Sequence, residues 1–347
     1  MADRITMLTA PPSGGVMDYV HTMTERLGAD ARVLVFDKQR SADLPIDGDC
    51  VLLHYSGYGF ARYGAPLDLL WWIQRNRPRM KRFGVFFHEI YAQSNSPASS
   101  VFWLSPVQRY IASRLARSSD FWFSNIELST EWLARRAGSV PHRRLAIYSS
   151  VGELHALPAA RDNTLIVFGS SPVRAETWRQ GGQALFDWAR TRGIALHDIG
   201  APIVDADTAA ALQRHGVTTH GRLEIDRIHA LMRNATWGAV AYPPHYVAKS
   251  SVFAAYCAHG MAPLLLSNRP PGSDGLVPGT HYVLNVPATP GPGAIEVDAI
   301  GRAAFDWYQD HRIDACVEAI GALLRSPDAP SHSSPPPSRN SARPEQA

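Results

Sequence analysis

The feature of this sequence that most constrains its fold is a regular alternation of short apolar runs with longer amphipathic segments. In the first half, the segments between the runs place apolar residues at helical spacing. The runs lie in "RITML", "ARVLVFD", "DCVLLHYSG", "RFGVFFHEIYA" and "DFWFSN". Strands that alternate with helices in this way form parallel sheets that are covered by helices on both faces. We therefore predict an α/β protein.

The same alternation starts again after a polar stretch, with further runs in "TLIVFGSS", "IALHDIG", "VTTHG", "WGAVAYP" and "APLLLS". A chain of 347 residues is long enough for two domains. We predict two Rossmann-like doubly wound domains, residues 1–155 and 156–325, with the boundary within 152–163. A last helix over 301–325 can cross back to the first domain. The Pro/Ser-rich tail, 326–347, is expected to be disordered.

Composition and charge restrict the class of partner. The chain is 45% hydrophobic and 19% charged, as in ordinary globular proteins. A net charge of +3 argues against nucleic acid as a partner. Two short basic clusters, 75–82 and 135–144, are either solvated faces or contacts to anionic lipid.

The location of the protein is also indicated by what the sequence lacks. There is neither an apolar run of membrane-spanning length nor the apolar core of a signal peptide. We expect a cytoplasmic protein that is at most peripheral to the inner face of a membrane. Cys50, Cys257 and Cys316 are far apart and have no metal-site spacing, so we expect three buried thiols.

Ligands of doubly wound sheets bind at the carboxyl ends of the strands, so the residues that follow each strand are candidates. Gly14 and Gly15 follow the first strand, where a glycine loop and a helix N-terminus can hold an anion, although a plain tight turn also explains them. Ser170, Ser171 and Arg174 follow the first strand of the second domain and are either phosphate ligands or surface residues. A GxGxxG fingerprint of nicotinamide binding is absent.

Two further strands end in titratable or aromatic residues. His88 and Glu89 follow an apolar strand; the imidazole can carry a proton near neutral pH, and the carboxylate can act as a base or hold a sugar hydroxyl. The alternative is a histidine that is hydrogen-bonded within the core. His54 and Tyr55, with the Gly/Tyr loop to residue 64, either line an acceptor site or pack as structural aromatics.

The segment "YVAKSSVFAAYCAHG" reads as a short buried helix with a polar entry. Ser250 or Ser251 can cap its N-terminus, and Gly260 suits its C-terminal end. Capping does not explain Lys249, because a cation beside a helix N-terminus is unfavourable by roughly 0.3–1 kcal/mol. A bound diphosphate would reverse that sign. The alternative is a lysine that extends into solvent.

Taken together, these segments resemble bacterial GT-B fold glycosyltransferases, nearest to the family 4/group 1 type of polysaccharide biosynthesis. The resemblance covers about residues 1–325. It is carried by "SGGVMDYVHTMTERL", "FFHEIYA", "SNIELSTEWL", "HGRLEIDRIHALMRNATWGAVAYP" and "KSSVFAAYCAHGMAPLL". It implies a metal-independent hexosyltransferase without a cofactor, whose donor substrate is a nucleoside-diphosphate sugar. The implied acceptor is a glycan or a lipid-linked molecule in surface polysaccharide or glycoconjugate assembly.

The resemblance also implies roles for the candidate residues. The C-terminal domain would bind the nucleotide sugar, with Lys249, Ser250 and Ser251 on the diphosphate. The N-terminal domain would bind the acceptor, with the two loop glycines near the diphosphate and the donor sugar. His88 would lie near the transferred sugar, and His88 or Glu89 would be the base of an inverting reaction.

This sequence departs from the family pattern at the donor site. Two glutamates eight residues apart are common in such enzymes, and the matching positions here are Val247 and Ala255. Of a basic pair after the first strand of the second domain, Arg174 alone remains nearby. The implied donor site is therefore divergent. Two alternatives stay open, a non-catalytic nucleotide-sugar-binding subunit of another transferase and a sugar-nucleotide epimerase of the same fold.

Overall fold

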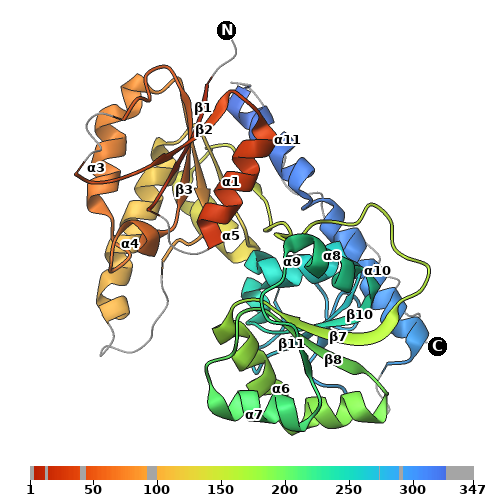
Figure 1. Ribbon diagram of the computed structural model, residues 1–347. Coiled ribbons are helices and arrows are strands. Elements are labelled where there is room, and N and C mark those ends of the chain that lie inside the picture. Colours follow the sequence, from red (N-terminus) through yellow and green to blue (C-terminus); the bar gives the residue numbers. More distant parts are fainter. Residues whose placement is uncertain are drawn as a thin grey trace, which may run out of the picture.

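A computed structural model describes residues 4–11, 15–39, 44–91, 100–272, 274–288 and 292–325. Two α/β domains follow one another along the chain, each built on a six-stranded parallel sheet (Figure 1). The predicted fold class is confirmed. Gly14 and the Pro/Ser-rich tail lie outside the described residues.

The N-terminal sheet has the strand order β2-β1-β3-β4-β5-β6. Every residue of its strands β1 and β3 is buried, and most of these residues are apolar, because helices cover both faces of the sheet. The strands are β1 (Ile5–Thr9), β2 (Ala31–Val35), β3 (Cys50–Tyr55), β4 (Arg82–Phe87), β5 (Phe121–Ser124) and β6 (His142–Arg144). The helices are α1 (Gly15–Leu27), α2 (Gly57–Phe60), α3 (Leu67–Asn76), η2 (Arg77–Arg79), α4 (Ser100–Ser118) and α5 (Glu127–Ala137).

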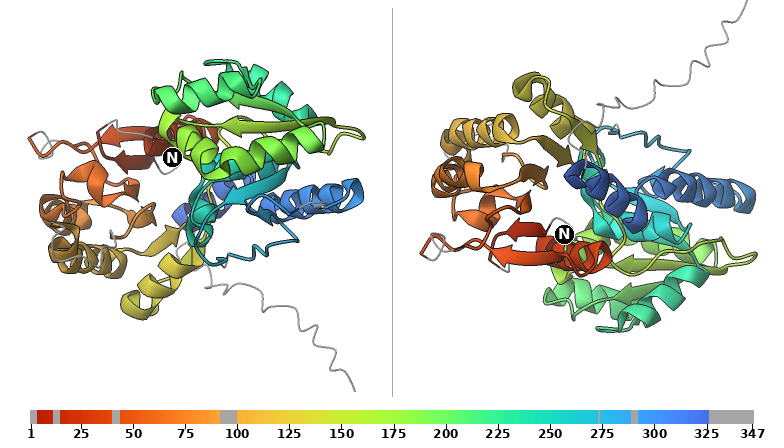
Figure 2. Two further views of the ribbon diagram at one scale, coloured as in Figure 1. Left: turned by 90° about the horizontal axis from the view of Figure 1, so that it is seen from below. Right: turned by 90° about the horizontal axis from the view of Figure 1, so that it is seen from above.

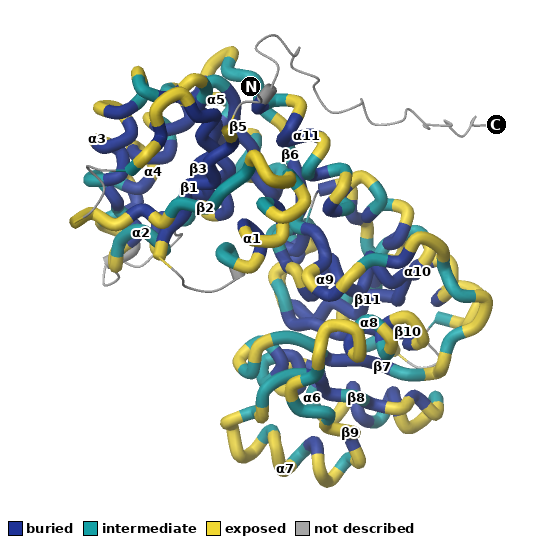
Figure 3. Tube along the Cα trace, turned by 45° about the horizontal axis from the view of Figure 1, so that its top comes forward, coloured by how far each residue is buried: buried dark blue, intermediate teal, exposed yellow. Residues whose placement is uncertain are grey.

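The C-terminal sheet has the order β12-β11-β10-β7-β8-β9. In Figure 3 its inner strands are drawn as buried, while the outer helix α7 is largely exposed. The strands are β7 (Asp162–Phe168), β8 (Ala195–Ile199), β9 (Thr218–Thr219), β10 (Ala235–Ala241), β11 (Ala262–Leu266) and β12 (Val283–Leu284). The helices are α6 (Ser171–Thr191), α7 (Ala206–Arg214), α8 (Ile225–Asn234), η3 (Pro244–Lys249), α9 (Ser251–Ala258), α10 (Ala294–Gln309) and α11 (Ile313–Arg325).

The end of the chain differs from the expected single helix over 301–325. It forms two helices, α10 and α11, with a break at residues 310–312. Helix α10 packs on α9 and β11 of the C-terminal domain, whereas α11 packs on α1 and β4 of the N-terminal domain. Both views in Figure 2 show the chain returning in this way. The break lets the chain change direction, because the two helices pack on different domains.

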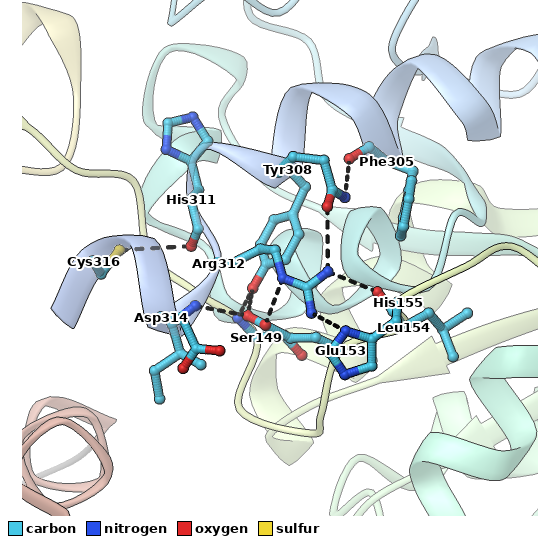
Figure 4. A network of polar contacts seen from close by, with 12 residues as sticks. Ser149, Glu153, Leu154, His155, Phe305, Tyr308, His311, Arg312, Asp314 and Cys316 are labelled. Atoms are coloured by element: carbon cyan, nitrogen blue, oxygen red, sulfur yellow. Dashed lines mark hydrogen bonds and ion pairs between the residues drawn. The ribbon is translucent and has the colours of Figure 1, made fainter. Parts of the chain in front are cut away.

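A polar network holds this break against the segment that joins the two sheets (Figure 4). The carboxylate of Glu153 is its centre. It accepts hydrogen bonds from the Tyr308 hydroxyl at 2.6 Å and from the Ile313 backbone N–H at 3.0 Å. The Arg312 Nε lies 3.4 Å from the same carboxylate. Glu153 therefore binds the first free N–H of α11 and the last turn of α10 together.

Replacing Tyr308 with phenylalanine is expected to lower the free energy of unfolding by about 1–3 kcal/mol. The hydroxyl also accepts a hydrogen bond from the Ser149 N–H at 2.7 Å, so its removal leaves the buried Ser149 N–H and the partly buried Glu153 carboxylate without this partner. Urea denaturation followed by tryptophan fluorescence measures the change. The control is Tyr63→Phe, at an exposed tyrosine, which should stay within about 0.5 kcal/mol of the wild type. Equal stability of the two variants would show that the network is not stabilising.

Candidate active site

One cavity of about 300 Å³ is lined by residues of both domains. The N-terminal domain contributes residues that follow the carboxyl ends of β3, β4 and β5, and the C-terminal domain contributes residues of η3, after β10. Ligands of doubly wound sheets bind at such strand ends. The side chains that carry the chemistry of this interdomain cavity are His88, Glu89, Gln108, Trp132, Tyr246 and Lys249.

A second cavity of about 170 Å³ lies at the topological switch point of the N-terminal sheet, where β1 and β3 are neighbours. Ala10, Pro11, Val16 and His54 are among the residues that line it. Gly15, at the start of α1, is the neighbour of Val16 in the chain. The first turn of α1 therefore borders the switch-point cavity, and Gly14 lies outside the described residues.

Lys249 is the last residue of η3 and directs its ammonium group across the domain boundary. Its Nζ lies 4.0 Å from Oε1 of Glu89 and 5.4 Å from the centre of the Tyr246 ring. The side chain is 24% exposed, and burial lowers the pKa of Lys249, an effect that the nearby Glu89 carboxylate opposes. Glu89, predicted at the end of a strand, and Lys249, predicted at the entry of a helix, are thus brought together in the cavity.

Ser250 and Ser251 have different positions at the entry to α9. Ser250 is the N-cap, and its Oγ accepts a hydrogen bond from the Phe253 N–H at 3.2 Å. Ser251, the first helical residue, is exposed. Val247 and Ala255, at the positions where glutamates are common in the resembling family, are buried in the apolar core. Side chains of the apolar core therefore stand at both of these positions.

The N-termini of α6 and α9 lie next to each other. Gly169, which has a φ of +125°, directly follows β7, and a Cβ atom placed on it would approach Val252 Cγ2 to 3.0 Å. Ser170, the N-cap of α6, is exposed, and its side chain makes no capping hydrogen bond. The entries of α6 and α9 are therefore close together, and a helix entry leaves backbone N–H groups without intrahelical partners, which favours an anion there.

Arg174 lies in the protein interior instead of the cleft. Its side chain is fully buried, forms an ion pair with Asp198, and donates hydrogen bonds to the carbonyls of Gly169 and Ala201. The second Asp198 oxygen accepts from the Trp178 indole N–H at 2.7 Å. All three guanidinium nitrogens are therefore engaged within the domain, and the structure does not bring Arg174 together with Lys249.

His88 is paired with His54 through their ring nitrogens. His54 Nδ1 lies 3.1 Å from His88 Nε2, so one ring donates a hydrogen bond to the other. Burial lowers the pKa of His54 to about 3. Burial, and then the neighbouring His54 and Lys249, lower the pKa of His88 as well. Both imidazoles are consequently neutral at pH 7, and they connect the switch-point cavity to the interdomain cavity.

No protein-family model matches the sequence, and no curated protein matches it either. Solved structures match the arrangement of both domains at low identity. Trehalose 6-phosphate synthase of Burkholderia multivorans is 12% identical with a TM-score of 0.57, over 93% of this chain and 96% of that one. Sucrose-phosphate synthase of Thermosynechococcus elongatus is 13% identical with a TM-score of 0.58, over 93% and 98%. The chain has the GT-B fold.

A third match with the GT-B fold covers a smaller share of the matched protein. The pneumococcal O-GlcNAc transferase GtfA, in complex with UDP and GlcNAc, is 10% identical with a TM-score of 0.54. The match covers 83% of this chain and 58% of that one. At such identities the comparison establishes the GT-B fold and leaves the activity to be argued from the site.

Several residues of the GT-B cleft are absent from the set chosen from the sequence. Tyr246, Gln108 and Trp132 line the interdomain cavity. Tyr246 was detectable in principle, because it precedes Lys249 by three residues, one turn of a 3₁₀-helix. Gln108 and Trp132 lie inside helices whose sequence pattern gives no sign of a nearby cavity.

The buried histidine pair predicts a loss of stability at acidic pH. His54 has a lowered pKa in the folded state, so the unfolded chain binds its proton first as the pH falls below about 6.5. The free energy of unfolding should fall by about 2 kcal/mol from this residue alone between pH 7.5 and pH 5. In His54→Phe the difference in thermal midpoint between these pH values should therefore shrink. His21→Gln, at an exposed histidine, should leave it unchanged; equal pH dependence in both variants would contradict the assignment.

Proposed function

We propose that this protein is a glycosyltransferase that moves a sugar from a nucleoside-diphosphate sugar to a glycan or lipid-linked acceptor. The proposal rests on one observation, the convergence of Lys249, which directly precedes the N-cap of α9, with Glu89 and His88 of the opposite domain in one cavity. The GT-B fold and the UDP in the pneumococcal match support it. We place its work in surface polysaccharide or glycoconjugate assembly at the cytoplasmic side of the membrane, without a metal requirement.

In this proposal the diphosphate binds at the entries of α6 and α9. Lys249 at the end of η3, with Ser250 and Ser251 at the entry of α9, would face it from one side, and Ser170 at the entry of α6 would face it from the other. The bond between the anomeric carbon and the diphosphate oxygen breaks during transfer, and negative charge develops on the leaving group. A fixed ammonium and free backbone N–H groups stabilise that charge without rearranging, which is the largest electrostatic contribution that such a site offers.

The acceptor would bind on the N-terminal side, between the loop after β3 and the start of α5. Its hydroxyl oxygen forms the new bond to the anomeric carbon, and its proton passes to a base of the N-terminal domain. Glu89 is the more accessible base, since its side chain is 47% exposed and its Oε2 accepts from the Ser56 hydroxyl at 3.1 Å. His88, neutral and beside it, can also receive the proton. This assignment holds for an inverting reaction.

Titration with UDP, GDP and their sugar derivatives tests the proposal, with the thermal midpoint as the first readout. Binding of one nucleotide should raise the midpoint, because ligands stabilise the state that binds them. Turnover of the matching donor with cell-derived acceptors, also in the presence of EDTA, would support the transferase. Binding without turnover would favour a non-catalytic subunit, and epimerised donor would favour an epimerase. Absence of nucleotide binding would sink all three.

A further inference from the structure

Helix α4 exposes an unusual set of side chains along its outer face. Trp103 is 67% exposed and Tyr110 is 55% exposed, although large aromatic side chains are usually buried. The spacing of three, four, four and three residues places five side chains on one face of the helix. We name this face the α4 stripe, which consists of Trp103, Pro106, Tyr110, Arg114 and Arg117.

The charge of α4 has one sign. The helix sequence "SVFWLSPVQRYIASRLARS" contains three arginines and neither aspartate nor glutamate. Arg114 has no ion-pair partner within the described part of the chain. Arg117 donates to the backbone carbonyl of Arg136 at 2.5 Å, which leaves its charge without a counter-ion there. The α4 stripe thus presents aromatic rings at one end and free positive charge at the other.

Several arginines of the two basic clusters noted in the sequence, 75–82 and 135–144, form ion pairs within the protein. Arg77 binds Asp120 through two hydrogen bonds of 2.6 and 2.7 Å. Arg79 pairs with Asp47, and Arg135 with Glu131. Arg144 lies 3.2 Å from Asp274. These four arginines have internal counter-ions, whereas α4 has no acidic residue of its own, so we base the inference on α4.

The inner side of the same helix borders the proposed active site. Gln108, on the opposite side of α4 from Tyr110, is buried and lines the interdomain cavity. An α-helix with its side chains is about 10–12 Å across. A molecule held at the α4 stripe by its lipid end could therefore reach the cavity over one helix diameter.

We propose that the α4 stripe docks on the surface of an anionic phospholipid bilayer. Trp and Tyr rings favour the headgroup level of membranes, and arginines favour the anionic phosphates. A convex helix face with one sign of charge suits a lipid surface better than a protein partner, which would need acidic groups opposite each arginine. No described helix is long and apolar enough to span a membrane. The idea that docking brings a lipid-linked acceptor to the site rests on the proposed function. The docking itself can be measured whether or not the protein is a transferase.

Sedimentation of the full chain with lipid vesicles tests the docking. One vesicle type is phosphatidylcholine alone, and the other contains phosphatidylglycerol as half of its lipid. The wild type should pellet with the anionic vesicles at low salt and be released by high salt. Trp103→Glu/Tyr110→Glu should lower the partition coefficient by at least about tenfold. Arg114→Gln should lower it by about fivefold, the effect of one basic residue near such a surface.

Matched changes in the C-terminal domain control for charge and hydrophobicity. Ile295→Glu alters an apolar residue that is 86% exposed, and Arg214→Gln an exposed arginine. Neither should change the partition coefficient. Failure of the wild type to bind anionic vesicles, or equal losses in the control variants, would overturn the proposal. So would a change of oligomeric state in Trp103→Glu/Tyr110→Glu without any change in vesicle binding, which would assign the stripe to a protein contact.

The same samples separate this inference from the proposed function. Nucleotide titration of the α4 variants should give the wild-type affinity, because the altered side chains face away from the cavity. If the wild type binds vesicles but no nucleotide, docking stands and the transferase proposal fails. If it binds nucleotide but no vesicles, the transferase proposal stands and the docking fails.

Discussion

Lys249→Ala is expected to lower kcat/KM for the nucleotide-sugar donor by about 100- to 1000-fold, the usual effect of removing one preorganised group from a developing negative charge. The ammonium is held at the cleft between Glu89 and Tyr246, so little rearrangement precedes its contact with a diphosphate. Steady-state kinetics with the donor found by titration measures the effect. Affinity for the nucleoside diphosphate should fall together with kcat/KM.

Lys38→Ala is the matched control for this prediction. Lys38 also pairs with a carboxylate, Asp68, at 2.7 Å, but its side chain is 72% exposed and far from the cavity residues in the chain. Its loss should leave kcat/KM within about twofold of the wild type. Unchanged nucleotide affinity in Lys249→Ala would remove the diphosphate role from this lysine, and with it the observation that carries the proposed function.

Arg174→Ala is expected to lower the free energy of unfolding by about 3–5 kcal/mol, because it leaves Asp198 as a buried carboxylate without its cation. For a domain of this size the thermal midpoint should fall by about 6–20 °C. Differential scanning calorimetry measures the transition. The effect should be structural, so the affinity for nucleotide below the transition should stay near the wild-type value.

A double replacement sharpens this prediction. Arg174→Met/Asp198→Leu removes both charges and should recover a large part of the lost stability, since apolar pairs of similar volume often replace buried ion pairs without loss. A single variant with wild-type stability but weakened nucleotide binding would return Arg174 to the phosphate role that its position in the sequence suggested.

The strand and helix pattern was largely readable from the sequence because it depends on local periodicity. The residues at which individual helices begin and end were harder to predict. Proline favours the first turn of a helix, yet α4 begins at Ser100 and continues through Pro106. The break between α10 and α11 was missed because both sides share a helical pattern and the cause, the carboxylate of Glu153, lies far away in the chain.

In the candidate site, too, some residues could be predicted from the sequence and others could not. His88, Glu89 and Lys249 could be singled out because each follows a strand or precedes a helix without a structural reason for its charge. The burial of Arg174 could not be foreseen, since Asp198 is 24 residues away and meets it through the pairing of β7 with β8. The pairing of His54 with His88 likewise needs the register of β3 against β4.

Helix α11 has a consequence for the order in which the protein folds during synthesis. Its buried residues Cys316, Ile320 and Leu324 belong to the same core as Met7 and Leu52 of the N-terminal sheet. The Cys50 thiol donates to the Leu324 carbonyl at 3.5 Å. At about 5–20 residues per second, some 170 residues of the second domain take roughly 10–35 s to emerge before this cover exists. The half of the molecule that the ribosome makes first is therefore the last to be complete.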